Sequence, residues 1–99
     1  MHCHDTYSTS LVNIFKSLEM GIRTFDASVS GLGGCPYAPG AGGNVCTEDV
    51  VYLLHELGYE TGINLNELVK VGNWISKEMD RTNLSRVGKA ILATVKKPK

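Results

Sequence analysis

The sequence has no excess charge of either sign, because ten lysine and arginine residues balance ten aspartate and glutamate residues among 99. It also has no cluster of basic residues interleaved with aromatics, which is the pattern that holds a phosphate backbone. No apolar run approaches the roughly 18 residues of a membrane span. We therefore expect neither nucleic acid nor a membrane as a partner.

Cysteine is scarce and irregularly spaced. The chain has three cysteines and no CxxC pair, so the sequence shows no disulfide framework. This cysteine usage is typical of a protein in a reducing compartment. The residues from Met1 to Asp5 are not typical of a signal or transit peptide. A chain of 99 residues suits one small globular unit, whereas a complete α/β barrel needs roughly 250 residues.

Hydrophobic periodicity predicts four helices. Thr47 and Asn64 are residue types that cap helix N-termini, and Asn64 is followed three residues later by Glu67, as in a capping box. The apolar positions of the third helix include Val71 and Trp74. The predicted helices cover residues 6–20, 47–57, 64–79 and 85–95.

A short β-rich stretch over residues 22–29 predicts a strand after the first helix, which suggests a βα repeat. This strand and the stub of another before the first helix cannot form a sheet. A strand buried between helices needs ladder partners on both sides. We therefore expect an α/β protein whose sheet is completed by segments other than these 99 residues.

His2 and His4 form a His-X-His pair. One intervening residue places both imidazoles on the same face of a strand but on different faces of a helix. At the C-terminal end of a strand such a pair is well placed to bind a metal ion. Two histidines so spaced are also compatible with ordinary surface residues or a tag remnant.

Residues 30–45 contain six glycines and two prolines, which fits no regular element, and long irregular loops in small domains are often functional. Cys35 lies near the centre of this stretch, where an exposed thiol is available for chemistry. Asn44, near its end, offers a neutral oxygen ligand suited to Mg²⁺ or Mn²⁺, or else is a turn residue that tolerates positive φ. No Lys-Ser/Thr follows the glycines, which disfavours a phosphate-binding loop.

Three motifs together resemble the hydroxymethylglutaryl-CoA lyase family. The His-X-His and Gly-Asn pairs are shared with related metal-dependent barrel synthases, whereas the Gly-Gly-Cys-Pro-Tyr-Ala loop is specific to the lyases. The resemblance runs through nearly the whole chain. The motifs are His2-Cys3-His4-Asp5-Thr6-Tyr7, the run FDASVSGLGGCPYA over residues 25–38, and Gly43-Asn44 followed by Thr47-Glu48-Asp49.

The resemblance implies a (β/α)₈ barrel with extra C-terminal helices. Residues 1–99 are then a single partial domain, running from the end of strand seven through helix eight to the trailing helices. The family carries an Arg-Asp pair on its first strand, and no Arg-Asp dipeptide precedes His2. We therefore expect the isolated chain to be inactive, because the metal lacks its charged protein ligand.

The implied reaction is the divalent-metal-dependent cleavage of 3-hydroxy-3-methylglutaryl-CoA to acetyl-CoA and acetoacetate, a step of leucine degradation and ketone body formation. His2, His4 and Asn44 match the family's ligands for Mg²⁺ or Mn²⁺. Cys35 matches its loop thiol, a general acid/base, and His2 also matches a position near the substrate hydroxyl.

The resemblance further places Gly33 and Gly34 in the substrate loop. Asp5 and Glu48 are expected to orient metal ligands, although Glu48 is equally interpretable as an acid in the first turn of a helix. The intact enzyme is expected to be a homodimer. Its compartment is expected to be the mitochondrial matrix in a eukaryote or the cytoplasm in a bacterium.

Two alternatives to lyase activity stay open. One is a related acyl-CoA-condensing synthase of the same metal-dependent barrel superfamily, against which the Cys35 loop argues. The other is a non-catalytic Cys/His metal-binding or interaction module that uses His2, His4, Cys35 and Cys46. These four residues lack the paired spacing of structural zinc sites.

Overall fold

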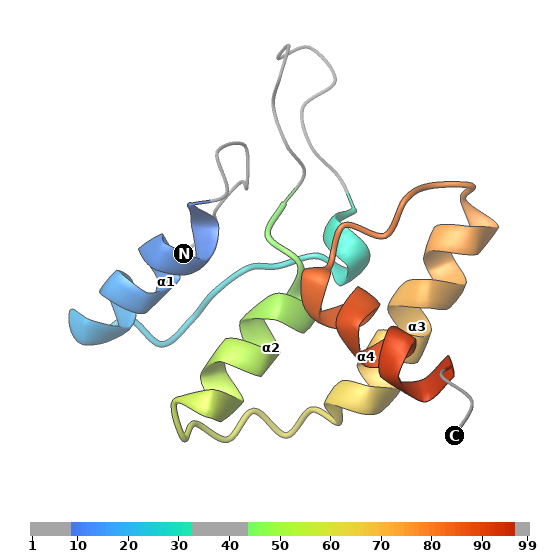
Figure 1. Cartoon of the computed structure of the whole chain (residues 1–99). Helices are drawn as coiled ribbons and strands as arrows, with labels where there is room; N and C mark the ends of the chain where they lie inside the picture. Colours follow the sequence, from blue (N-terminus) through green and yellow to red (C-terminus); the bar gives the residue numbers. More distant parts are fainter. Residues whose placement is uncertain (1–8, 33–43, 97–99) are drawn as a thin grey trace, which may run out of the picture.

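Four α-helices and one short 3-10 turn form the regular structure of the described part of the chain, residues 9–32 and 44–96 of a computed structural model (Figure 1). Within these residues, no helix has both the length and the apolar character needed to cross a bilayer. The four helices predicted from periodicity are confirmed. In chain order the elements are α1 (Ser10–Glu19), η1 (Val29–Gly31), α2 (Thr47–Glu56), α3 (Leu65–Glu78) and α4 (Arg86–Lys96).

The segment between α1 and η1 is extended and passes alongside α2 (Figure 1). It contains no named strand, although the sequence predicts one over residues 22–29. Its pairing is a parallel bridge between Ser28 and Cys46, with hydrogen bonds from Ser28 N to Val45 O (3.0 Å) and from Thr47 N to Ser28 O (2.9 Å). A strand requires a continuous ladder, whereas this segment has only isolated bridge positions, at Asp26 and Ser28.

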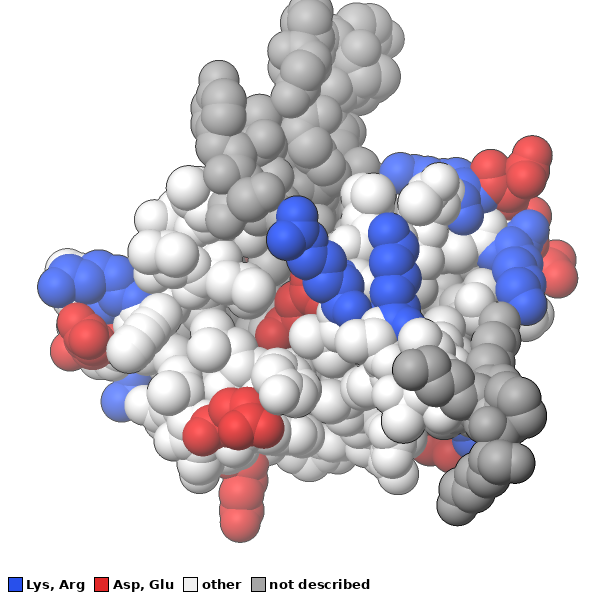
Figure 2. Space-filling view, viewed as in Figure 1, with Lys and Arg blue, Asp and Glu red and all other residues white. Residues whose placement is uncertain are grey.

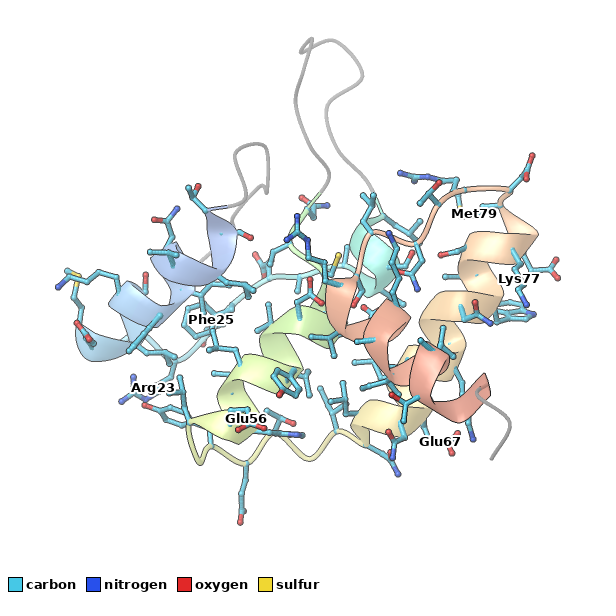
Figure 3. All side chains as sticks on the ribbon, in the orientation of Figure 1. Arg23, Phe25, Glu56, Glu67, Lys77 and Met79 are labelled. Atoms are coloured by element: carbon cyan, nitrogen blue, oxygen red, sulfur yellow. The ribbon has the colours of Figure 1, made fainter. Side chains whose placement is uncertain are left out.

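The core lies between α1, the extended segment and α2. Phe25 on the extended segment packs against it, and Figure 3 shows this side chain between the two helices. On α1, Ile14 and Leu18 are buried as the periodicity predicts, whereas Ser10 and Ser17 share the buried face and Phe15 is 38% exposed. The buried cluster comprises Ile14, Leu18, Val45 and Val50, with Leu11, Leu53 and Leu54 packed around it.

The helix caps agree only partly with the sequence. Asn64 caps α3 as predicted, because its Oδ1 accepts a hydrogen bond from Glu67 N at 3.2 Å. The prediction that Thr47 is a cap is wrong. Cys46 occupies the N-cap of α2 and Thr47 is already helical, because the bridge to Ser28 holds Cys46 in an extended conformation until the helix begins.

The apolar face of α3 also differs from the prediction. Val69, Gly72 and Ser76 are its buried positions, whereas Trp74 is 58% exposed and Val71 is 50% exposed. Glycine and serine at the buried positions allow close approach of the neighbouring segments. The helix thus uses its small residues, and not its largest apolar ones, for packing.

The described residues form a slab of 43 × 37 × 19 Å. Its thinnest dimension accommodates about two helices, each about 10–12 Å across. Figure 2 shows that the area between α1 and α2 is largely uncharged in this view, with charged side chains toward the edges and over α4. Below the extended segment, an apolar hollow of about 440 Å³ is lined by residues that include Arg23, Phe25 and Tyr59.

Candidate functional site

The two ends of the glycine-rich stretch are joined at its base. The parallel bridge between Ser28 and Cys46 holds the segments that enter and leave it. Closer to the stretch, Asn44 Nδ2 donates a hydrogen bond to Leu32 O at 3.1 Å. We call residues 28–32 and 44–48 the loop base, because they flank residues 33–43 on both sides. The loop base therefore fixes where Asn44 lies relative to the incoming segment.

Ser30 and Gly31 give the loop base its sharp change of direction. Ser30 has a φ of 52° and Gly31 a φ of 77°, so two consecutive residues adopt left-handed conformations. Gly31 has no room for a side chain, because a Cβ there would lie 2.9 Å from Cys46 Sγ and 3.0 Å from Leu84 Cβ. Ser30, by contrast, carries a side chain in a conformation that only glycine adopts readily.

Glu48 ties the first turn of α2 to this turn. Its carboxylate accepts a bifurcated hydrogen bond from Ser30 N, at 2.9 Å to Oε1 and 3.1 Å to Oε2. The Glu48 side chain is fully buried beside Gly72 of α3, and a Cβ on Gly72 would overlap Oε2. The glycine at position 72 therefore makes room for the carboxylate.

Burial raises the pKa of Glu48 above its ordinary value of 4.5. The hydrogen bond from Ser30 opposes this shift, and the nearby negative charge of Asp49 adds to it. Desolvation outweighs the hydrogen bond because a carboxylate in an apolar surrounding loses its hydration on all sides. Glu48 is thus an acid in the first turn of α2 whose carboxylate is hydrogen-bonded to the loop base through Ser30 N.

α3 and its connection to α4 complete the surroundings of Ser30. The hydroxyl oxygens of Ser76 and Ser30 are hydrogen-bonded at 2.9 Å, in a buried position. Ser76 Oγ also lies 2.8 Å from Gly72 O. Leu84 N donates to Ser30 O at 3.2 Å. The amide N–H, the carbonyl and the hydroxyl of Ser30 therefore bind three different elements.

Asp49, next to Glu48, connects α2 to α4. Its Oδ1 accepts hydrogen bonds from Ser85 Oγ at 2.7 Å and from Val87 N at 3.1 Å. Ser85 Oγ in turn accepts a hydrogen bond from Gly88 N at 2.8 Å. A carboxylate at a helix N-terminus satisfies unpaired amides and interacts favourably with the helix dipole. Asp49 therefore caps α4 from a neighbouring helix.

Of the residues predicted to form the site, Asn44 and Glu48 lie in the described part, and both are at the loop base. The bond from Nδ2 to Leu32 orients the Asn44 amide, which leaves Oδ1 as its cation-binding atom. A neutral oxygen of this kind fits Mg²⁺ or Mn²⁺. The other predicted residues lie outside the described part: His2, His4, Asp5, Gly33, Gly34 and Cys35.

Cys46, a candidate ligand in the alternative Cys/His metal-binding module, is buried, with its Sγ packed near Gly31. Residues 9–32 and 44–96 contain no group of three or more His, Cys, Asp or Glu side chains placed to hold a metal ion.

Sequence reasoning did not identify Ser30 and Ser76. Serine is common on protein surfaces, and a separation of 46 positions gives no periodic signal that would pair the two. The available hint was Ser30-Gly31 at the start of the glycine-rich stretch, a pattern typical of a turn.

Residues 1–75 match the sequence model of the HMGL-like family. The chain belongs to the HMGL-like family. Over 92 residues it is 53% identical to hydroxymethylglutaryl-CoA lyase of Pseudomonas mevalonii, a match that covers 93% of this chain and 31% of the relative. The chain thus spans about a third of the length of this relative, and the family match leaves out the end of α3 and all of α4.

Solved structures of HMGL-like relatives agree with this assignment. The crystal structure of hydroxymethylglutaryl-CoA lyase from Pseudomonas aeruginosa superposes with a TM-score of 0.88 at 53% identity, over 94% of this chain and 31% of that structure. An Acinetobacter baumannii HMG-CoA lyase in complex with coenzyme A and 3-methylmalate gives a TM-score of 0.84 at 42% identity, over 90% of this chain and 29% of that structure. The described residues therefore have the fold of the corresponding part of an HMG-CoA lyase.

Proposed function

We propose that these 99 residues form the metal-binding and loop-bearing part of a hydroxymethylglutaryl-CoA lyase, which cleaves 3-hydroxy-3-methylglutaryl-CoA to acetyl-CoA and acetoacetate. The observation that carries the proposal is the identity of 53% to a lyase over 93% of the chain. The loop base supports it, because it brings Asn44 beside the segment that leads into the Gly-Gly-Cys-Pro-Tyr-Ala motif.

In a barrel-length protein, we assign the chain to the end of strand seven through helix eight, followed by the extra C-terminal helices. The extended segment at 22–28 and α2 are then the eighth strand and its helix. The parallel bridge of Ser28 is consistent with this assignment, because parallel pairing is the rule in such barrels.

His2, His4 and Asn44 are the residues that would hold a divalent cation, Mg²⁺ or Mn²⁺. When bound, the cation would supply Lewis acidity to the 3-hydroxyl and carboxylate oxygens of the substrate. Asn44 contributes a neutral ligand whose orientation is fixed by Leu32 O.

The chain's own residues then transfer two protons, one from the substrate hydroxyl and one to the departing enolate. The bond between C2 and C3 of the substrate breaks as the C3 hydroxyl loses its proton and becomes the ketone of acetoacetate. The electron pair moves onto C2 of the departing acetyl-CoA enolate, which takes up a proton to give the methyl group. We assign these transfers to His2, near the hydroxyl, and Cys35, on the loop.

Several further properties belong to the same proposal. Asp5 and Glu48 orient the ligands, and Gly33 and Gly34 allow the loop backbone to approach the substrate closely. The intact enzyme is a homodimer that acts in leucine degradation and ketone body formation. Its compartment is the mitochondrial matrix in a eukaryote or the cytoplasm in a bacterium.

A chimera tests the proposal. The upstream part of the Pseudomonas mevalonii lyase is joined to the 99 residues, and release of acetoacetate from 3-hydroxy-3-methylglutaryl-CoA is followed with Mn²⁺. We expect lyase activity that depends on the cation, and no activity from the 99 residues alone. Condensation of a 2-oxo acid with acetyl-CoA, measured in the same chimera, would instead support a related synthase. A folded chimera that catalyses neither reaction would refute the assignment.

A further inference from the structure

We infer that Ser76 is a positioning residue, which acts through Ser30 to hold the loop base in the conformation that presents Asn44 to a cation. The inference rests on the proposed function only for the identity of the bound group. Its structural part, the coupling of Ser76 to Ser30, stands on hydrogen bonds and burial alone.

The first step is the backbone of Ser30. A serine at a φ of 52° is in a region that is unfavourable for residues with a Cβ, and such conformations persist only where the surroundings impose them. Ser30 is 2% exposed, and its N–H, carbonyl and hydroxyl all bind protein groups. The contacts come from α2, from α3 and from the connection between α3 and α4. Together they hold Ser30 in a conformation that a glycine would adopt without such support.

The second step is the position of Ser76. It lies at the buried face of α3, one residue beyond the part of the chain that matches the family model. Leu84, which binds the carbonyl of Ser30, also lies beyond it. The C-terminal helices therefore contribute directly to the loop base and are more than an outer covering.

The third step links Ser30 to Asn44. Ser30 is separated from Leu32 by Gly31 alone, and Leu32 O accepts the hydrogen bond that orients the Asn44 amide. If Ser30 relaxed toward a right-handed conformation, Leu32 O would turn away from Asn44 Nδ2. Loss of the Ser76 contact should therefore misplace the amide oxygen of Asn44 and weaken cation binding.

Three variants separate conformation from hydrogen bonding. Ser76→Ala and Ser30→Ala each remove the hydroxyl pair and keep a Cβ at position 30. Ser30→Gly removes the same pair but makes the left-handed backbone easy to adopt. The matched control is Ser17→Ala on α1, because Ser17 is buried like Ser76 and its Oγ makes the same kind of bond, to Asn13 O four residues earlier at 2.8 Å.

Two readouts are used, and neither requires catalysis. Amide hydrogen exchange of Ser30 in the chimera reports the loop base directly. The Mn²⁺ dissociation constant of the chimera, from the EPR signal of unbound Mn²⁺, reports the cation site. We expect Ser76→Ala and Ser30→Ala each to raise the exchange rate of the Ser30 amide and the Mn²⁺ dissociation constant by about three- to tenfold. This is the range of one buried hydrogen bond. Ser30→Gly should change each by less than about twofold.

Each contrary result has a distinct meaning. If Ser76→Ala accelerates exchange no more than Ser17→Ala does, Ser76 is not coupled to Ser30 and the inference fails. If exchange accelerates but Mn²⁺ affinity is unchanged, Ser76 stabilises the loop base without positioning Asn44, which also overturns it. Equal damage from Ser30→Gly and Ser30→Ala would refute the conformational argument. A chimera that binds Mn²⁺ as expected but releases no acetoacetate would overturn the proposed function and leave this inference intact.

Discussion

Replacing Gly72 with alanine should push a methyl group into the carboxylate of Glu48 and loosen the loop base. Gly72 lies on the buried face of α3, and a Cβ there would overlap Glu48 Oε2 and lie 3.3 Å from Cδ. Glu48 has no space to retreat into, because it is fully buried and bound to Ser30 N. The substitution must therefore displace the carboxylate or separate α2 from α3.

The magnitude follows from three effects. Overpacking costs about 1–3 kcal/mol. Weakening the hydrogen bond from Ser30 to the carboxylate costs about 1.5–3 kcal/mol if it is lost. Alanine in place of glycine inside a helix returns about 1 kcal/mol. We therefore expect Gly72→Ala to lower the free energy of unfolding by about 2–4 kcal/mol.

The assay is a double-mutant cycle of urea unfolding, followed by far-UV circular dichroism of the 99-residue chain. In a Glu48→Ala background the carboxylate is gone, and the next atom near the new Cβ is Val29 Cγ1 at an ordinary 3.5 Å. There, Gly72→Ala should stabilise the protein by up to about 1 kcal/mol through helix propensity. An osmolyte such as sucrose keeps the weaker variants folded throughout the series.

The change of sign between the two backgrounds is the decisive result. Gly88→Ala on α4 is the matched control, because its Cβ would meet Ser85 Oγ at 3.2 Å and no carboxylate. It should stay within about 1 kcal/mol of the parent in both backgrounds. Equal destabilisation by Gly72→Ala with and without Glu48 would refute the steric and electrostatic argument made for this pair.

The other predictions concern catalysis, capping and pH. In the chimera, Cys35→Ser should reduce turnover by orders of magnitude with Mn²⁺ affinity nearly unchanged, whereas His4→Ala should weaken Mn²⁺ binding first; loss of metal binding in Cys35→Ser would contradict this division of roles. Asn64→Ala should lower the free energy of unfolding by about 0.5–2 kcal/mol, measured by urea unfolding, because Glu67 N loses its acceptor. The raised pKa of Glu48 means that the folded state binds its proton more tightly, so its contribution to stability is full below pH 4.5 and is lost as the pH rises toward the folded-state pKa. Unfolding free energies measured against pH should therefore show a decline above pH 4.5 that Glu48→Gln abolishes, and parallel curves for the two proteins would refute it.

The sequence predicted those features that depend on local periodicity and local chemistry. All four helices were predictable from apolar spacing, and the Asn64 cap from residue type. Thr47 was misassigned as a cap because the bridge between Cys46 and Ser28 depends on residues 18 positions apart. Trp74 was expected to face inward from its apolar character, but the buried face of α3 is selected by the close approach of neighbouring segments.

The same limit of prediction from local sequence applies to the loop base. Asn44 was recognisable as a candidate because an amide oxygen follows the glycines, and Glu48 because of the family resemblance, its position after Thr47 indicating only the first turn of a helix. Ser30 and Ser76 were not, because their importance arises from a left-handed backbone and a hydrogen bond across 46 residues. Residue type alone does not reveal either of these.

The first turn of α2 explains how a short sequence motif organises several elements at once. Consecutive residues on a helix point about 100° apart, so Glu48 and Asp49 reach different neighbours. Glu48 binds Ser30 at the loop base, and Asp49 binds Ser85 at the start of α4. Because α3 also contacts Ser30 through Ser76, the two acids and one serine connect the loop base to every helix that follows it. Changes in the C-terminal helices should therefore reach the candidate cation site through α2 and Ser30, without direct contact between those helices and the cation.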